Sequence, residues 1–315
     1  MSKKKLAILA IGGNSLILDK DHQTVPDQYG AVEQTCSHIA GLVQKGYNVV
    51  ITHGNGPQVG FILRRSELSK HELHEVPLDS CGADTQGSIG YQIQQAMINV
   101  TKGWKEQPLT ATVVTQVLVD RNDPSFQKPS KPIGSFMSKE DAEHHKAKEG
   151  WDIVEDAGRG FRRVVASPIP KKVLELEAIK TLLDKNIIVV AVGGGGIPVV
   201  EKDGRIVGTA AVIDKDLASS LLARELEADL LIISTAVDAV YLNYKKPDQK
   251  KLGKITMGDA KKYMAEGHFA PGSMKPKIAA CIEFLETGGK EALITDPAHL
   301  VEALDGKAGT WIVAK

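Results

Sequence analysis

Short runs of aliphatic and β-branched residues alternate with helical patterns along most of the chain. Residues 6–11 read as a strand, residues 28–45 as an amphipathic helix and residues 48–52 as a second strand, which together predict a βαβ unit. The same alternation returns later, with a strand expected at 187–192 and a helix at 216–227. Parallel strands need crossover helices, so this rhythm predicts a layered α/β fold around a mainly parallel sheet.

The other expected elements follow from the same periodicity, and one segment interrupts it. They are helices at 84–103, 172–185, 257–266 and 276–287, a hairpin around 201–205, and strands at 108–120, 229–234, 291–295 and 310–314. Residues 121–170 break the rhythm with a stretch rich in Pro, Lys and Ser, a charged helix and a short strand. We interpret this segment as an insertion.

Composition limits the class of protein. The 315 residues, of which 42% are hydrophobic, are enough for one large domain or two lobes. The 39 basic and 39 acidic residues cancel, which argues against nucleic acid and acidic membranes as partners. The three cysteines lack metal-ligand or disulfide spacing, and neither a signal peptide nor a membrane span is expected. A soluble protein of the cytoplasm is therefore expected.

Three expected strands run directly into glycine-containing loops. They are "LAILAIGGN" at 6–14, "VVITHGNGPQVG" at 49–60 and "VVAVGGGG" at 189–196. Ligands of open α/β sheets bind beyond the carboxyl ends of the strands, and bare backbone amides can hold phosphate there. Glycine after a strand is often only turn chemistry, but three such loops favour a shared phosphate site. The P-loop and dinucleotide fingerprints are both missing.

Lysines at two expected helix starts support an anion site. Lys215 begins one helix, with Asp216 as a plausible N-cap, and Lys277 begins another, with Ser273 as a possible cap. A cation at a helix N-terminus opposes the helix dipole by about 0.3–1 kcal/mol, and a phosphate in front of the helix would reverse that sign. We therefore expect both lysines to face phosphate.

Other charged residues are assigned from their sequence context. Lys131 lies between prolines inside the insertion and could reach over a site as a lid. Asp214 could be an ordinary helix cap, but we favour the interpretation that it holds the lysines in position by ion pairing. His53 is interpreted as a strand-end histidine that supports its loop, and the histidine spacing predicts no direct metal site.

Six motifs in this order resemble the carbamate kinases of the amino acid kinase family: "AIGGNSL", "THGNGPQVG", "KPSKPIG", "AVGGGGIPV", "VIDKDLAS" and "GSMKPK". The resemblance covers essentially the whole chain. Acetylglutamate kinases carry a lysine two residues before the first Gly-Gly, where this chain has Ala10. The resemblance implies that Lys131, on the insertion, supplies the missing charge.

The resemblance implies a three-layer αβα sandwich with two lobes and a protruding subdomain. Residues 1–227 would form a lobe for carbamate or carbamoyl phosphate, with the subdomain at about 121–170, and residues 228–315 a nucleotide-binding lobe. The implied reaction is reversible phosphoryl transfer between ATP and carbamate, running toward ATP in arginine breakdown. It also implies a homodimer, and Mg²⁺ held mainly by nucleotide phosphates.

The expected site residues fall into three groups. The carbamoyl side and the transferred phosphoryl group would be held by Gly12, Gly13, Asn14, Gly54 and Asn55. The nucleotide would lie near Gly194, Gly195, Asp238, Tyr244 and Met274, with Lys277 on its phosphates. Lys131 and Lys215 would neutralise the transferred group, with Asp214 as their partner.

Three alternatives remain open at this point. The chain could phosphorylate another acid within the same family, although Ala10 and the insertion argue against this. It could be a non-catalytic module that binds phosphorylated ligands and regulates another process. A nicotinamide-dependent dehydrogenase is a weaker alternative, because the dinucleotide fingerprint is absent.

Overall fold

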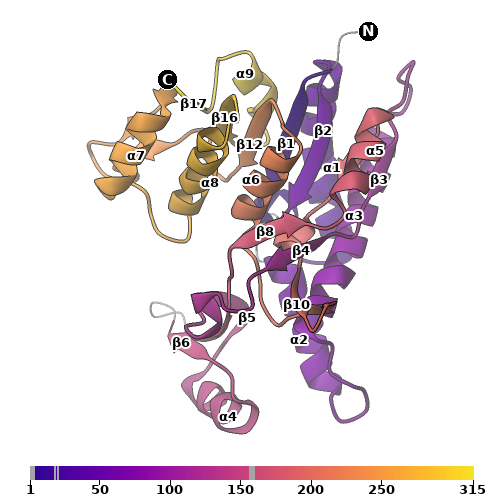
Figure 1. The fold of residues 1–315 in the computed structure, drawn as a ribbon, viewed down its shortest axis with the longest axis vertical. Helices are drawn as coiled ribbons and strands as arrows, with labels where there is room; N and C mark the ends of the chain where they lie inside the picture. Colours follow the sequence, from indigo (N-terminus) through magenta and orange to yellow (C-terminus); the bar gives the residue numbers. More distant parts are fainter. Residues whose placement is uncertain (1–3, 18, 20, 156–159) are drawn as a thin grey trace.

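The computed structural model describes residues 4–17, 19, 21–155 and 160–315. Its centre is an eight-stranded sheet (Figure 1). In spatial order the strands are β15 (Lys254–Thr256), β17 (Thr310–Val313), β16 (Glu291–Thr295), β12 (Leu230–Ser234), β1 (Leu6–Ile11), β2 (Asn48–His53), β9 (Ile188–Val190) and β3 (Thr110–Thr112). The six strands from β16 to β3 are parallel, and the pair β15–β17 runs the other way.

Helices cover both faces of this sheet. One face carries α1 (Val25–Gln44), α3 (Leu78–Val100) and α9 (Leu300–Leu304), and the other carries α5 (Leu176–Asp184), α6 (Lys215–Glu225), α7 (Met257–Ala265) and α8 (Met274–Glu286). Successive side chains of a strand point to opposite faces, so Leu9 of β1 packs with the first group and Ile8 with the second. The expected three-layer αβα sandwich with a mainly parallel sheet is confirmed.

A second sheet carries the insertion. Its strand order is β11 (Arg205–Gly208), β10 (Ile197–Lys202), β4 (Gln116–Val119) and β8 (Pro170–Val173). Because β4 and β8 pair antiparallel, with Val119 opposite Pro170, the chain leaves and re-enters this sheet at neighbouring positions. A long segment can therefore project from the body without disturbing the sheet.

The projecting segment has a sheet of its own, seen at the lower left of Figure 1. It contains η2 (Pro124–Phe126), β5 (Lys131–Met137), α4 (Lys139–Glu149), β6 (Ile153–Glu155) and β7 (Phe161–Val165), with the strand order β5-β7-β6. The helix α2 (Gly56–Ser69) packs against β5. Residues 156–159 of the expected insertion lie outside the described residues.

The elements that complete the chain are short. They are η1 (Gly13–Ser15), η3 (Gly193–Gly195), and the paired strands β13 (Tyr241–Leu242) and β14 (Lys250–Lys251). The expected boundary at residue 228 falls just before β12, which pairs directly with β1, so one sheet crosses it. The division into two lobes stays a prediction.

Three expectations about elements were wrong. The single strand expected at 108–120 is two strands, β3 and β4, which belong to different sheets. The helix expected from residue 172 begins only at Leu176, because β8 occupies the preceding residues. The loop expected through residue 60 ends at Asn55, because α2 begins at Gly56, and Pro57 suits the first turn of a helix.

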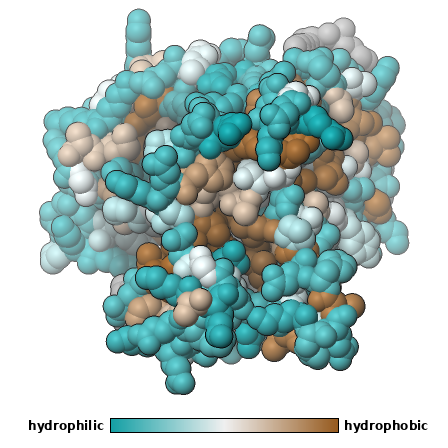
Figure 2. All heavy atoms as spheres, turned by 60° about the horizontal axis from the view of Figure 1, so that its bottom comes forward, coloured by the Kyte–Doolittle hydropathy of each residue, from teal (hydrophilic) through white to brown (hydrophobic). Residues whose placement is uncertain are grey.

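The surface is mostly hydrophilic. Figure 2, which brings the lower end of the molecule forward, shows hydrophobic side chains gathered in the hollowed middle of this face. Among the described residues, no helix has the length and apolar character needed to cross a membrane.

Candidate active site

The three glycine-containing loops lie side by side, because β1, β2 and β9 are neighbours in the parallel sheet. The Gly54 amide donates a hydrogen bond to the Ile11 carbonyl at 3.2 Å, which joins the first two loops. The Gly193 backbone lies against the His53 ring, which joins the second loop to the third. The carboxyl end of the sheet therefore presents one continuous rim of backbone.

Two helices begin at this rim. α2 starts at Gly56, directly after β2, and α6 starts at Lys215. The side chain of Lys215 lies over the loop that contains Gly54. A Cβ atom added to Gly54 would be 3.5 Å from Cδ of Lys215. Helix N-termini carry partial positive charge and free amides. The two helix ends alone therefore favour an anion at the rim, and the lysines add to this effect.

One buried aspartate holds two of the three expected lysines. The carboxylate of Asp216 accepts hydrogen bonds from Lys215 Nζ at 2.6 Å and Lys277 Nζ at 3.0 Å. The side chains are 6% exposed for Asp216 and 14% exposed for each lysine. Two of the lysines expected from the sequence thus meet at one carboxylate. Lys277 lies 61 residues after Asp216 along the chain.

Asp214 has both of the roles considered for it from the sequence. It caps α6, because its side chain accepts a hydrogen bond from the Asp216 amide at 2.9 Å. Its other oxygen accepts from Lys131 Nζ at 2.9 Å. The expectation that Asp214 pairs with the lysines therefore holds for Lys131, and the expectation that Asp216 is the N-cap was wrong.

The second expected cap is also only partly right. Ser273 occupies the N-cap position of α8, but its side chain makes no capping hydrogen bond.

The electrostatics of the cluster leave a surplus of positive charge. Burial would raise the pKa of Asp216, but Lys215 and Lys277 outweigh it and lower the pKa to about 2. Burial lowers the pKa of Lys215, and the nearby Lys277 adds to this, while Asp216 opposes it. Two buried ammonium groups share one carboxylate, so an incoming anion would find an unbalanced charge.

His53 supports the loop after β2 as expected from sequence. It is 1% exposed, and its Nδ1 donates to the Gly54 carbonyl at 2.9 Å. Burial, helped by the nearby Lys215, lowers its pKa to about 4, against the raising effect of the hydrogen bond to Gly54. The imidazole is therefore neutral near pH 7 and holds the Gly54 backbone in place.

The four glycines at 193–196 are packed tightly against protein. A Cβ on Gly194 would overlap the side chain of Asn55, and one on Gly195 would be 2.6 Å from the Ile213 carbonyl oxygen. Gly194 and Gly195 also have φ values of 68° and 94°, which side chains disfavour. Packing against protein thus accounts for the bare backbone at these positions, and the expected contact with phosphate stays a prediction.

Two amides of this tract bond locally: those of Gly195 and Gly196 donate to the Val192 and Gly193 carbonyls at 3.1 Å and 3.0 Å. The assignment of Gly194 and Gly195 to nucleotide phosphates stays a prediction.

The residues expected on the carbamoyl side lie at the same rim. Gly12 packs against Ser234, and the space beside Gly13 is open. The Asn55 side chain is 8% exposed and donates to Thr85 Oγ1 at 2.9 Å, so it is fixed in place. The backbone of Asn14 lies in η1, while its side chain is outside the described part of the structure.

A cavity of about 370 Å³ adjoins the end of β12. Tyr244 and Met274, both expected near the nucleotide, line it together with Tyr241. Asp238 does not line the cavity; its carboxylate accepts hydrogen bonds from Tyr241 Oη at 2.8 Å and Lys251 Nζ at 2.6 Å. Lys251 is the main cause of its lowered pKa. Asp238 therefore acts on the cavity through Tyr241.

The first turn of α8 connects the cavity to the lysine cluster. Met274, its first residue, lines the cavity, and Lys277, three residues on, bonds to Asp216. A ligand in the cavity could thus extend along α8 to Lys277. Within the described residues, no group of three or more His, Cys, Asp or Glu side chains could hold a metal ion.

Sequence reasoning missed Asp216 as the centre of the cluster and α2 as the helix behind the second loop. The alternation Asp-Lys-Asp at 214–216 was the available signal for Asp216. It could not distinguish the two carboxylates, because their partners come from β5 and α8.

Comparison with known proteins identifies the family. The family model described as "Amino acid kinase family" matches residues 5–296. The chain belongs to the amino acid kinase family. An Escherichia coli relative named "Carbamate kinase-like protein YahI" is 49% identical, over 98% of this chain and 99% of its own length. Carbamate kinase from Thermococcus kodakarensis is 48% identical, over 98% and 99% of the two lengths.

Solved structures agree with this membership. Carbamate kinase from Giardia lamblia bound to AMP-PNP aligns with a TM-score of 0.93 and 44% identity, covering 99% of each chain. The likeness spans the whole chain, including the insertion. The resemblance to the carbamate kinases of the amino acid kinase family, first seen in six motifs, is confirmed.

Proposed function

We propose that this chain is a carbamate kinase, which transfers a phosphoryl group reversibly between ATP and carbamate. The observation that carries the proposal is the first turn of α8, which joins the cavity beside β12 to the Lys215–Asp216–Lys277 cluster at the glycine rim. Nearly full-length identity of 48% to a carbamate kinase supports the choice of acceptor.

The nucleotide occupies the cavity lined by Tyr244 and Met274, with its phosphates directed along α8 toward Lys277. Gly194 and Gly195 lie near these phosphates. Asp238 fixes Tyr241 in the cavity wall.

Carbamoyl phosphate occupies the rim formed by Gly12, Gly13, Asn14, Gly54 and Asn55. The backbone amides of the rim and the N-terminus of α2 hold its oxygens. Lys215 and Lys131 approach the phosphoryl group, each positioned by its own aspartate.

The transfer itself requires alignment and neutralisation of charge. In the direction of ATP formation, the bond from the carbamate oxygen to phosphorus breaks while a β-phosphate oxygen of ADP attacks from the opposite side. Charge develops on the oxygens of the moving group, where preorganised ammonium groups and amides stabilise it. No side-chain nucleophile is needed, and His53 stays neutral and structural.

Mg²⁺ enters as part of the nucleotide substrate. Asp214 and Asp216 are both occupied by lysines, and the described residues contain no carboxylate cluster for a metal. The phosphate oxygens therefore supply most of its ligands.

The metabolic setting completes the proposal: a cytoplasmic enzyme that forms ATP during arginine breakdown and works as a homodimer. Three buried, unpaired cysteines suit a reducing compartment. Exposed apolar side chains on α3 and beside β3, among them Tyr91, Ile98, Leu109 and Val114, support an interface at this edge of the sheet.

One assay tests the function. Purified protein is mixed with ADP, Mg²⁺ and carbamoyl phosphate, and ATP is measured by luciferase, with acetyl phosphate as the matched alternative donor. We expect ATP from carbamoyl phosphate and far less from acetyl phosphate. Folded protein that binds ADP but forms no ATP would overturn the proposal and favour a regulatory phospho-ligand module.

A further inference from the structure

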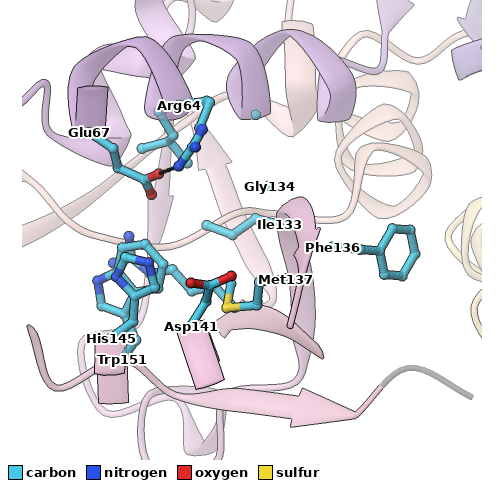
Figure 3. Close-up of a pocket in the computed structure, with 12 residues that line it drawn as sticks. Arg64, Glu67, Ile133, Gly134, Phe136, Met137, Asp141, His145 and Trp151 are labelled. Carbon is cyan, nitrogen blue, oxygen red and sulfur yellow. Dashed lines mark hydrogen bonds and ion pairs between the residues drawn. The ribbon is translucent and has the colours of Figure 1, made fainter. Parts of the chain in front are cut away.

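A second cavity lies between α2 and the projecting segment, and none of its lining residues belongs to the lysine cluster or the nucleotide cavity. Its volume is about 240 Å³, below the roughly 300 Å³ at which pockets for drug-sized ligands begin. Figure 3 shows α2 on one side of this cavity and the projecting segment on the other. The site would suit a ligand of few heavy atoms.

Arg163 of β7 brings its guanidinium into this cavity. It lies 4.5 Å from the centre of the Trp151 ring and makes no hydrogen bond or ion pair with another described residue. Burial lowers its pKa, against the effect of nearby acidic residues such as Glu67. A fork of donors in this position suits a carboxylate, which can accept two parallel hydrogen bonds.

Two carboxylates face the same space from opposite walls. Glu67 of α2 has one oxygen bonded to Arg64 at 3.1 Å, and Asp141 of α4 has one oxygen bonded to Ser138 at 2.8 Å. In each carboxylate, the second oxygen has no hydrogen-bond donor among the described residues. Figure 3 shows both groups pointing toward the cavity. These oxygens suit an ammonium group.

The aromatic wall of the cavity is held rigidly. The His145 ring stacks on Trp151 with 4.2 Å between the ring centres, as Figure 3 shows. His145 also bonds to Glu149 at 3.0 Å, and Glu149 bonds at 2.6 Å to Lys70, the residue that follows α2. The cavity is therefore preformed, which lowers the entropic cost of binding.

We infer that this cavity is a second binding site, for a free α-amino acid. Its walls combine two guanidinium groups with two carboxylates, so a simple anion or a simple amine would meet repulsion as well as attraction. A zwitterion places its carboxylate on Arg163 and its ammonium on Glu67 and Asp141. Leu63, with Ile133 and Met137, offers apolar surface for a small side chain.

Occupancy of this site would affect the strand that carries Lys131. Ile133 and Gly134 line the cavity two and three residues after Lys131 in β5, and Gly60 of α2 packs closely on Gly134. A bound amino acid would join α2 to β5 and so restrict Lys131. This consequence rests on the proposed function, whereas the binding itself does not.

The test measures binding without ADP or carbamoyl phosphate, so it is independent of catalysis. The standard L-amino acids are screened against the whole protein by saturation-transfer NMR, and the Kd of the strongest binder is measured by calorimetry. The same amino acid without its ammonium, and without its carboxylate, is measured alongside; for L-valine these analogues are isovalerate and isobutylamine. The variants are Arg163→Gln and Glu67→Gln, with Arg65→Gln as the control because Arg65 lies on α2 but outside the cavity.

We expect at least one amino acid to bind wild type and Arg65→Gln equally, and both cavity variants to weaken it at least about tenfold. Each analogue should also bind at least about tenfold more weakly, since it leaves one charged wall without a partner. Circular dichroism checks that each variant is folded. If Arg163→Gln does not fold, the Kd measured for Glu67→Gln tests the inference by itself. The inference is overturned if no amino acid binds, if the cavity variants bind it normally, or if isovalerate or its equivalent binds as tightly.

Discussion

Lys215 combines deep burial with a position at the start of α6, directly over the loop that contains Gly54. If it neutralises the transferred phosphoryl group, Lys215→Ala should lower kcat about 10²–10³-fold, as removal of one preorganised group does in other enzymes. Luciferase detection of ATP measures the rate, and circular dichroism checks the fold. Lys250→Ala, an exposed lysine on β14, is the matched control. Near-normal turnover in a folded Lys215→Ala protein would refute the role.

Asp216 is the residue on which the cluster depends. Asp216→Asn keeps the shape but leaves two buried ammonium groups facing each other, so the free energy of unfolding should fall by about 3–5 kcal/mol. Urea denaturation measures this, and added phosphate should restore more stability to the variant than to wild type. A variant as stable as wild type would mean that the ion pairs contribute nothing.

The pKa of Asp216 adds a pH dependence to this prediction. Its folded pKa of about 2 lies below the ordinary 3.8, so its stabilising effect is complete above about pH 4 and is lost as the pH falls toward 2. Asp216→Asn should lack this part of the acid sensitivity.

His53 gives a pH dependence in another range. Its folded pKa is about 4 and its ordinary value 6.5, so between these values the unfolded chain binds a proton that the folded chain does not. Stability should therefore fall as the pH drops from about 6.5 to 4, by about 3 kcal/mol over the window. Urea denaturation across this range checks it, and His53→Gln should show a smaller slope. Equal slopes in both proteins would contradict the assignment.

Among the elements, the tract at 193–196 shows how a loop is fixed by its neighbours. In Gly194→Ala, the added methyl group would overlap the side chain of Asn55. The substitution would also strain the backbone, whose φ is 68° at this residue. We expect a loss of about 2–5 kcal/mol, from strain and overpacking together. Thermal and urea denaturation measure it.

Gly204 provides the control for this prediction. Its φ is 72°, but nothing lies within 4 Å of an added Cβ. Gly204→Ala should therefore cost only the backbone strain, about 1 kcal/mol. If both substitutions cost the same, the close contact with Asn55 has no energetic weight.

The elements also show where periodicity is sufficient. The buried run that became β12 is apolar on both faces, as strands in the middle of a parallel sheet must be, and its pattern alone placed it correctly. The run at 108–120 has similar composition but divides at 113–115, because Gln86 bonds to the Thr115 amide and carbonyl and turns the chain into the second sheet. That partner lies 29 residues away, so no local pattern contains it.

For the whole molecule, the apolar edge at α3 and β3 predicts the assembly. Leu109 is 69% exposed and Tyr91 is 61% exposed, and we expect a second copy of the chain to cover them. Leu109→Glu should weaken the dimer at least about tenfold by placing a charge in an apolar interface. Sedimentation velocity measures the dimer, with Leu73→Glu, at an exposed leucine outside this edge, as control. A monomeric wild-type protein would contradict the prediction.

The sequence alone determined the fold class and the chemical character of the site. Alternating periodicity specifies strands and crossover helices, and glycine after three of the strands specifies where bare backbone meets the edge of the sheet. Lysines at helix starts already indicated an anion-binding site, because both the charge of a residue and the direction of its helix can be read from a short stretch of sequence. These signals depend only on residues close together in the chain.

Only the tertiary structure decided which charges meet. Lys277 reaches Asp216 across 61 residues, and Lys131 reaches Asp214 across 83. The packing of α8 against α6 sets the first partnership, and the attachment of the insertion between β4 and β8 sets the second. Such pairings depend on long-range packing, in which many weak contacts act together, and for that reason a local reading chose the wrong aspartate as the centre of the site.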